Sequence, residues 1–312
     1  MSFPSNLNSF KTFRFRKWLF AFVAIFPLLN ILSSRAEMNL SAIPSEYGEV
    51  IYRYNEKSPN QLFIIGMSHR DSISRLNGQN TSRVQAEVYK LGEWLIQNRG
   101  LELLLPEGFF KKKTQMAKGK FRTTAANGYR SEPLDIKITE EKLSDTTSFI
   151  NAEMLLMKNY PLRTQQVEDQ KWYDAVGCFI RKLASSGNSC DYYLVKSELD
   201  YLQERRTAAL VQRIPEIINA EYHEGDIKSK RALLTIGMSH LCKIIKYLDE
   251  SKIRIYSPLA NSNKNEDYFA DLNLLRENFG VFIIIPGTLA HDPKILEINK
   301  LDRAVEKCRR RS

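Results

Sequence analysis

Residues 61–69, QLFIIGMSH, and residues 232–240, ALLTIGMSH, carry the same ending in two distant parts of the chain. Each segment begins as a short apolar run of the kind that forms a buried strand, and each ends in the pentapeptide IGMSH. The chain has 312 residues and only four histidines, and two of these, His69 and His240, lie in the repeat. The repeat predicts two equivalent strands, each of which brings a histidine to the end of a strand.

The segments around the two repeats alternate between strand and helix patterns. After Gln61–Gly66, residues 82–98 have the apolar spacing of a helix, and LELLLPEG (Leu101–Gly108) is a second strand. A strand, helix, strand unit predicts parallel pairing of its two strands. The last third contains three strands, RALLTIG, KIRIYS and VFIIIPG, separated by two helices, HLCKIIKYLDE and DYFADLNLLREN.

Between these two regions the pattern is mostly helical, from about 140 to 228, with one strand in LRTQQVED (Leu162–Asp169). We therefore expect an α/β fold. Its mostly parallel central sheet would come from two weakly symmetric α/β half-units, with a helical insertion between them. No low-complexity linker interrupts residues 37–312, which predicts a single domain.

The first 36 residues have the pattern of a signal peptide. A basic region ending at Lys17 precedes an apolar stretch, Trp18–Leu32, and small residues follow, with cleavage expected near Ala36. The apolar stretch is shorter than the ~20 residues of a membrane-spanning helix, although an uncleaved N-terminal anchor is the alternative reading. The protein is therefore expected to be exported, as a periplasmic or secreted protein.

Export changes the expected charge of the protein. Five of the 46 basic residues and none of the 36 acidic residues lie in the leader, so cleavage lowers the net charge from +10 to +5. The remaining positive charge is concentrated in Lys111–Arg122 and in Arg309–Arg311, which are expected to be solvated segments. A weak contact of Lys111–Arg122 with an anionic surface is the alternative, and nucleic acid is not an expected partner outside the cytoplasm.

Four cysteines meet an oxidising compartment after export. Cys178 and Cys190 flank a turn between two helical patterns, and we expect a disulfide between them. Cys242 and Cys308 have no obvious partners. Cys242 follows His240 by two residues, and it is expected to be a small buried residue on a helix rather than a metal ligand.

Functional groups in parallel α/β sheets gather where the strands end. Both histidines of the repeat are expected at this edge, and they would face one another across one pocket if the half-units are related by an approximate twofold axis. Glu107 directly follows a predicted strand and is expected at the same edge, close to His69 if their strands are neighbours. Arg206 shares its helix face with Leu210 and Ile214, so this arginine is expected to point inward and to need a carboxylate or a bound anion.

With these residues in this order, the chain resembles the TraB/GumN/Tiki family, within the superfamily that includes ChaN-like haem-binding proteins and erythromycin esterase-like enzymes. The resemblance covers about Tyr52–Ile285. Two features depart from the family pattern: Thr207 follows the arginine where an acidic or amide residue is usual, and Pro106 precedes the glutamate. The matching positions are Gly66 with His69, Glu107, Arg206, and Gly237 with His240.

The resemblance implies a metal-dependent hydrolase that cleaves peptide or small ester substrates. His69, His240 and Glu107 would hold a divalent ion such as zinc, manganese or cobalt. Glu107 would be a ligand or the general base, and Arg206 would stabilise an oxyanion or orient the glutamate. Two alternatives remain open at this point: a ChaN-like protein that binds haem or another ligand without catalysis, and a non-enzymatic protein that uses Lys111–Arg122 as a contact surface.

Overall fold

A computed structural model describes residues 43–68, 80–111, 135–145, 150–185, 190–258 and 268–310. The signal peptide expected for residues 1–36 lies outside these ranges, as do His69 and all of Lys111–Arg122 except Lys111. Residues from Ile43 onward form one compact unit. No helix within the described ranges is both long enough and apolar enough to cross a bilayer.

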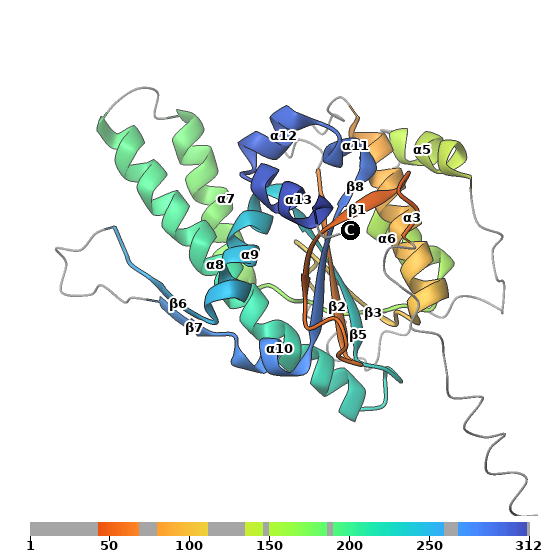
Figure 1. Ribbon diagram of the computed structural model, residues 1–312. Coiled ribbons are helices and arrows are strands. Elements are labelled where there is room, and N and C mark those ends of the chain that lie inside the picture. The colour runs from red at the N-terminus through yellow and green to blue at the C-terminus, as the bar shows by residue number, and fades with distance from the viewer. Residues whose placement is uncertain are drawn as a thin grey trace, which may run out of the picture. The chain divides into compact units, whose positions relative to one another are not determined.

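A six-stranded, mostly parallel sheet forms the centre of this unit (Figure 1). Helices cover the sheet, which confirms the predicted α/β class. Only β1 runs antiparallel to its neighbour, and it forms one edge of the sheet. In spatial order the strands are β1 (Gly48–Tyr54), β8 (Gly280–Pro286), β2 (Gln61–Met67), β5 (Arg231–Gly237), β3 (Leu103–Pro106) and β4 (Arg163–Thr164).

The two strands that carry the sequence repeat are direct neighbours. β2 and β5 pair in parallel, and their register places Gly66 opposite Ile236 and Met67 opposite Gly237. Phe63 and Ile64 of β2 and Leu233 of β5 have no solvent-exposed surface. Burial on both faces explains why these strands are continuous apolar runs without alternation.

The two half-units interlock. The sheet order places β5 between β2 and β3, and it places β2 between β5 and β8. Both neighbours of β2, the repeat strand of the first half-unit, therefore come from the second half-unit. Both neighbours of β5, the repeat strand of the second half-unit, come from the first. The expected pairing of the first two strands across their connecting helix is wrong, because β3 pairs with β5 instead of β2.

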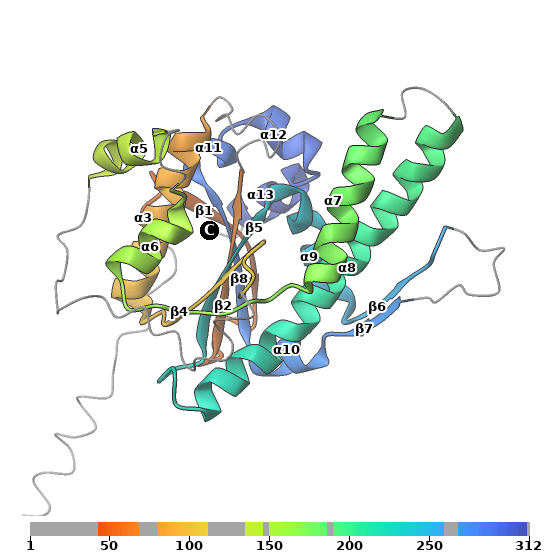
Figure 2. The same cartoon turned by 180° about the vertical axis from the view of Figure 1, so that it is seen from behind.

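Helices lie on both sides of the sheet. Figures 1 and 2 show α3 (Thr81–Arg99), α5 (Ile136–Ser144) and α6 (Ala152–Asn159) on one side. The other side carries the three helices α7 (Gln170–Ser185), α8 (Cys190–His223) and α9 (Leu241–Glu250). The predicted helical insertion thus corresponds to α5 to α8, although α5 and α6 pack on α3 and not on α7 or α8.

The C-terminal third differs from the expected alternation at one point. β6 (Lys252–Ile255) pairs with β7 (Tyr268–Asp271) in a separate antiparallel sheet, so the predicted strand KIRIYS does not join the central sheet. The predicted helix DYFADLNLLREN contains β7 and then the short helix α10 (Asn273–Asn278). In β7, Phe269 is exposed and Ala270 is buried, which is the alternation of a strand.

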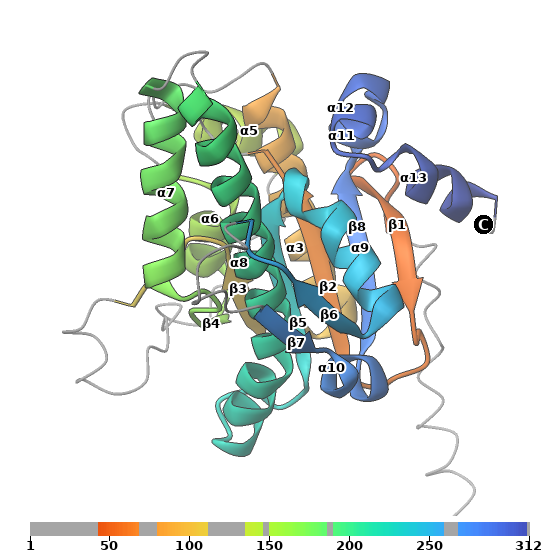
Figure 3. The same cartoon turned by 90° about the vertical axis from the view of Figure 1, so that its left-hand side faces the viewer.

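Three short helices complete the chain after β8. α11 (Gly287–Ala290) contacts α3, and α12 (Pro293–Ile298) leads to α13 (Asp302–Arg309), which packs against β1. Figure 3 shows α13 beside β1 and α9 on the neighbouring part of the sheet. The expected disulfide is not formed in this structure, since Cys178 is a free, exposed thiol on α7.

Candidate functional site

Glu107 and His240 meet where β3 and β5 end. The backbone N–H of Glu107 donates to the carbonyl of Thr235 at 3.0 Å, which continues the β3–β5 pairing for one residue. The Glu107 carboxylate then accepts a 2.6 Å hydrogen bond from the N–H of Gly237 through Oε2. Gly237 begins the turn Met238–His240, so Glu107 holds the turn that carries the histidine.

Arg206 lies between two carboxylates. Its Nη2 donates to Oε1 of Glu107 at 2.5 Å, and its Nε donates to Oε1 of Glu168 at 2.6 Å. All three side chains are nearly buried, with exposed fractions of 8% for Arg206, 11% for Glu107 and 1% for Glu168. The inward orientation predicted for Arg206 is therefore present, and the anions it binds are two glutamates of the same chain.

The residues of this cluster shift one another's pKa values. Burial raises the pKa of Glu168, and the nearby charge of Glu107 raises it further, although Arg206 opposes both effects. Burial alone would lower the pKa of Arg206, but the two carboxylates outweigh it and raise this pKa. Glu107 and Glu168 thus share the guanidinium of Arg206, and a buried cluster of this kind favours either the neutral form of one carboxyl or a further cation.

The orientation of His240 is set by Thr207, the residue after Arg206. The Thr207 hydroxyl donates to the carbonyl of Gln203 at 2.7 Å, and it lies 2.7 Å from Nδ1 of His240. A hydroxyl has one proton to donate, so Nδ1 must donate to Thr207. In the neutral imidazole, Nε2 then keeps its lone pair, and it lies 3.5 Å from Oε1 of Glu107.

This pair of atoms fits two ligands of a divalent metal. Nitrogen and oxygen ligands at ~2.0–2.2 Å from a tetrahedral metal are separated from one another by roughly 3.3–3.6 Å, and the observed separation is 3.5 Å. Without a cation or a proton between them, a neutral Nε2 and a carboxylate oxygen would present lone pairs to each other. The donor set therefore fits the metal that the resemblance implies, with one further ligand expected from His69.

The path from β2 to His69 can be followed as far as Ser68. Because Met67 pairs with Gly237, the chain leaves β2 next to the turn that carries His240. A side chain at Gly66 would place its Cβ in overlap with Leu241 Cδ1 and 2.8 Å from Met238 Sδ. The glycine of the first motif is thus needed for close packing against the helix that follows the second motif.

An aromatic side chain covers the cluster from α7. The ring of Tyr173 lies 4.8 Å from the guanidinium of Arg206, and Phe110 packs on this ring edge to face. Gly108 has a positive φ of 72° and donates its N–H to Oε2 of Glu168 at 2.8 Å. The turn after Glu107 therefore requires a glycine and connects the two carboxylates through the backbone.

The other histidines do not join this site. His291, which follows α11, is exposed, and its Nδ1 lies 2.7 Å from the carbonyl of Gly287. His223 is exposed at the end of α8. A separate acidic group, Glu221 with Glu224 and Asp226, has atoms close enough to hold an ion, but Arg163 already pairs with Glu221 at 2.5 Å and with Asp226 at 3.0 Å.

Sequence reasoning missed Glu168 and Tyr173 and did not assign a role to Thr207. Glu168 lies beyond β4 but inside the expected strand Leu162–Asp169, so the signal that marked Glu107, an acidic residue directly after a predicted strand, was absent. Glu107 was expected close to His69 if their strands were neighbours, but β5 lies between β3 and β2. The described partners of Glu107 include Gly237, Arg206 and His240.

Comparison with known proteins adds no relative at this point. The chain matches no protein-family model, no curated protein and no solved structure at a significant level.

Proposed function

We propose that this protein is an exported, metal-dependent hydrolase of the TraB/GumN/Tiki type that cleaves peptide or small ester bonds. The observation that carries the proposal is the pair formed by His240 Nε2 and Glu107 Oε1, 3.5 Å apart beside a buried arginine. An imidazole nitrogen and a carboxylate oxygen are both suited to bind a divalent cation. Export rests on the leader pattern of residues 1–36.

His240, Glu107 and His69 would hold the ion. A bound divalent ion would supply Lewis acidity and a water of lowered pKa. Glu107 would be either a ligand or the general base, because its Oε1 would bind the ion or accept the proton of an attacking water while Oε2 stays on the Gly237 N–H. Arg206 carries a permanent charge in a nearly buried position, where it is suited to stabilise the oxyanion of a tetrahedral intermediate.

Glu168 and Thr207 would act through their neighbours. Glu168 holds Nε of Arg206 and thereby keeps Nη2 directed at Glu107. Thr207 keeps the proton of His240 on Nδ1, so that Nε2 is the nitrogen offered to the ion. The site thus contains a base, a cation for the developing negative charge, and a ligand held in one tautomer.

The test compares metal content and hydrolysis in three proteins: the wild type, His240→Ala and the control His291→Ala. Each is incubated with zinc, manganese or cobalt, freed of excess metal, and analysed by elemental mass spectrometry. A fluorogenic peptide library and p-nitrophenyl esters then report hydrolysis. We expect about one ion per chain in the wild type and in His291→Ala, and loss of both metal and hydrolysis in His240→Ala.

Absence of metal from the wild-type protein after these incubations would reject the proposal. Full metal content and full hydrolysis in His240→Ala would reject the assignment of the site.

A further inference from the structure

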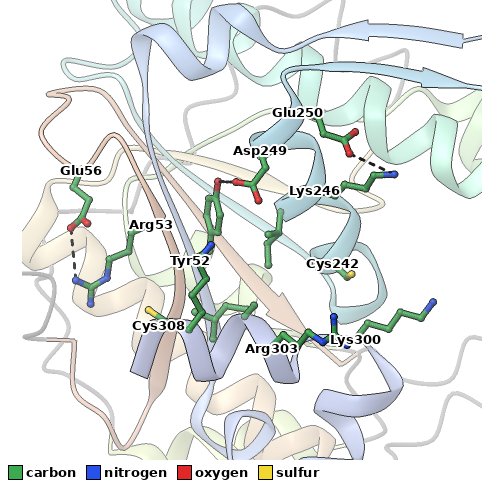
Figure 4. Close-up of a pocket in the computed structure, with 14 residues that line it drawn as sticks. Tyr52, Arg53, Glu56, Cys242, Lys246, Asp249, Glu250, Lys300, Arg303 and Cys308 are labelled. Carbon is green, nitrogen blue, oxygen red and sulfur yellow. Dashed lines mark hydrogen bonds and ion pairs between the residues drawn. The ribbon is translucent and has the colours of Figure 1, made fainter. Parts of the chain in front are cut away.

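A second site lies between β1, α9 and α13, apart from the glutamate cluster. It is a cavity of about 650 Å³ (Figure 4), within the range of small-molecule binding sites. None of its lining residues is Glu107, Glu168, Arg206, Thr207 or His240. The cavity therefore shares no described residue with the proposed hydrolase site.

Part of the cavity lining is apolar. Ile51 of β1, Ile245 of α9 and Ala304 of α13 line it together with the thiols of Cys242 and Cys308. The stripe of α9 that faces the cavity contains Cys242, Ile245 and Asp249, at helical spacing. A different side of α9 is held by α8, because the hydroxyl of Tyr247 donates to Oε1 of Glu204 at 3.3 Å.

Each acidic side chain of the lining has an ion-pair or hydrogen-bond partner. Glu56 pairs with Arg53 at 3.8 Å, and Glu250 pairs with Lys246 at 3.9 Å. Asp249 accepts a 2.8 Å hydrogen bond from the hydroxyl of Tyr52. Burial raises the pKa of Tyr52, and Asp249 raises it further, so that this hydroxyl remains a neutral donor.

Three cations of the lining have no acidic partner among the described residues: Lys300, Arg303 and Lys307. They are spaced three and four residues apart, which places Arg303 and Lys307 on one face of α13 with Lys300 just before it. Figure 4 shows Lys300 and Arg303 at the end of the cavity near Cys242, and Cys308 lies at the other end. The cavity thus has a cationic end and an apolar body.

Lys300 occupies a backbone position that favours glycine. Its φ is +56°, and it follows α12 in a C-terminal cap in which Leu301 N–H donates to Leu296 at 2.8 Å and Lys300 N–H donates to Glu297 at 2.9 Å. A lysine at this position has a less favourable backbone energy than a glycine. In return, the cavity gains a positive charge.

The wall that carries these cations is anchored to the sheet. Arg309 donates from Nε and Nη2 to the two carboxylate oxygens of Glu49 in β1, at 2.8 and 2.7 Å. Cys308 donates its S–H to the carbonyl of Val50 at 2.9 Å. Leu301 and Val305 are buried beneath α13, with exposed fractions of 0% and 2%. The cationic end is therefore part of a fixed wall.

We propose that this cavity binds an amphiphilic organic anion, with a carboxylate at Lys300 and Arg303 and a hydrocarbon body along Ile51, Ile245 and Ala304. The unmatched positive charges select a negative head group, because the acids of the lining are already engaged. The apolar part of the lining selects a hydrocarbon body. Decanoate and decanol are suitable probes, since they share a chain length and differ in charge.

Two measurements test the proposal on the full protein. Calorimetry compares decanoate with decanol, and we expect decanoate to bind roughly ten- to hundredfold more tightly. Alkylation by N-ethylmaleimide, followed by peptide mass spectrometry, reports occupancy. Decanoate should slow the labelling of Cys242 severalfold and leave Cys178, an exposed thiol on α7, unchanged.

Matched variants separate charge from shape. Lys300→Gln should weaken decanoate binding about tenfold, whereas Lys294→Gln, which removes an exposed lysine of α12 outside the cavity, should not. Ala304→Phe should fill the cavity and abolish the binding of both probes. Lys300→Gly should raise the melting temperature and still weaken decanoate binding, a combination that a purely structural role of Lys300 would not produce.

Any of three results would overturn the proposal. These are no decanoate binding to the wild-type protein, equal affinities for decanoate and decanol, or equal effects of Lys300→Gln and Lys294→Gln. Equal protection of Cys178 and Cys242 would likewise show that the probe binds non-specifically.

Discussion

Replacement of Arg206 by methionine should destabilise the protein strongly, and by an amount that depends on pH. The change removes the only cation that the described structure places between Glu107 and Glu168, and it leaves both nearly buried carboxylates without it. Breaking a buried pair by removal of one partner costs about 3–5 kcal/mol. We expect a loss of this size in the free energy of unfolding at about pH 7, which is a large part of the ~5–15 kcal/mol typical of whole proteins.

The pH dependence follows from the same charges. Without the guanidinium, the folded-state pKa values of both glutamates rise above their unfolded values of about 4.3. A group with a raised folded pKa stabilises the fold below its unfolded pKa, and this contribution is lost as pH rises through the folded pKa. The deficit of Arg206→Met should therefore be small near pH 4 and grow toward neutrality, by up to about 1.4 kcal/mol per pH unit for each carboxylate.

The assay is urea unfolding followed by far-UV circular dichroism at several pH values. Arg205→Met is the control, because this neighbouring arginine lies 4.1 Å above the ring of Trp172 and has no carboxylate partner among the described residues. Its loss should be about 1 kcal/mol or less at any pH. Adding Glu168→Gln to Arg206→Met should restore part of the stability. Similar losses of stability in the two arginine variants at neutral pH, or a deficit of Arg206→Met that does not vary with pH, would contradict the role of Arg206 as the cation shared by the two glutamates.

Three further changes test other parts of the site. Thr207→Val should leave Nδ1 of His240 without its acceptor and lower the free energy of unfolding by about 1–3 kcal/mol. It should also lower the metal affinity of the proposed enzyme by roughly ten- to hundredfold, as measured by chelator competition. Thr207→Ser should restore the affinity. Gly66→Ala should cost about 1–3 kcal/mol of unfolding free energy through overpacking, whereas Gly177→Ala, whose added carbon has no neighbour within 3.6 Å, should be neutral or stabilising. Because burial raises the folded-state pKa of Glu168, the wild-type protein should lose stability as pH rises above about 4.3. Glu168→Gln should remove this loss. An unchanged pH profile of the free energy of unfolding would contradict this.

The strands of the central sheet are predictable from the sequence because they are buried on both faces. Short apolar runs at Gln61–Gly66 and Arg231–Gly237 coincide with β2 and β5 within one residue. Their order is not predictable in the same way, because local pattern does not report which strand lies beside which. The parallel strands β2 and β3 are separated by β5, although α3 is the one described helix between them in the sequence.

The site is partly predictable for a similar reason. Arg206 lies on an apolar helix face whose neighbours Leu210 and Ile214 are 3% and 0% exposed, and a buried guanidinium requires an anion. Glu168 stands in an extended segment without periodicity, so nothing local indicates that it points inward. β7 was assigned to a helix because its four residues, YFAD, do not alternate between apolar and polar, and α10 begins two residues after β7 ends.

The interlocked sheet has a consequence for the order in which the protein folds. β2 ends at Met67, and its two neighbours in the sheet are β5 and β8. Both neighbours lie much later in the chain, between Arg231 and Pro286. During synthesis, more than half of the chain must therefore be made after β2 before its first strand partner, β5, exists. Contacts of such long sequence separation slow folding and favour a single cooperative transition over folding in halves. A ribosome-bound or truncated chain that stops before β5 should remain unfolded, and the central sheet should form only after the last third of the protein has been made.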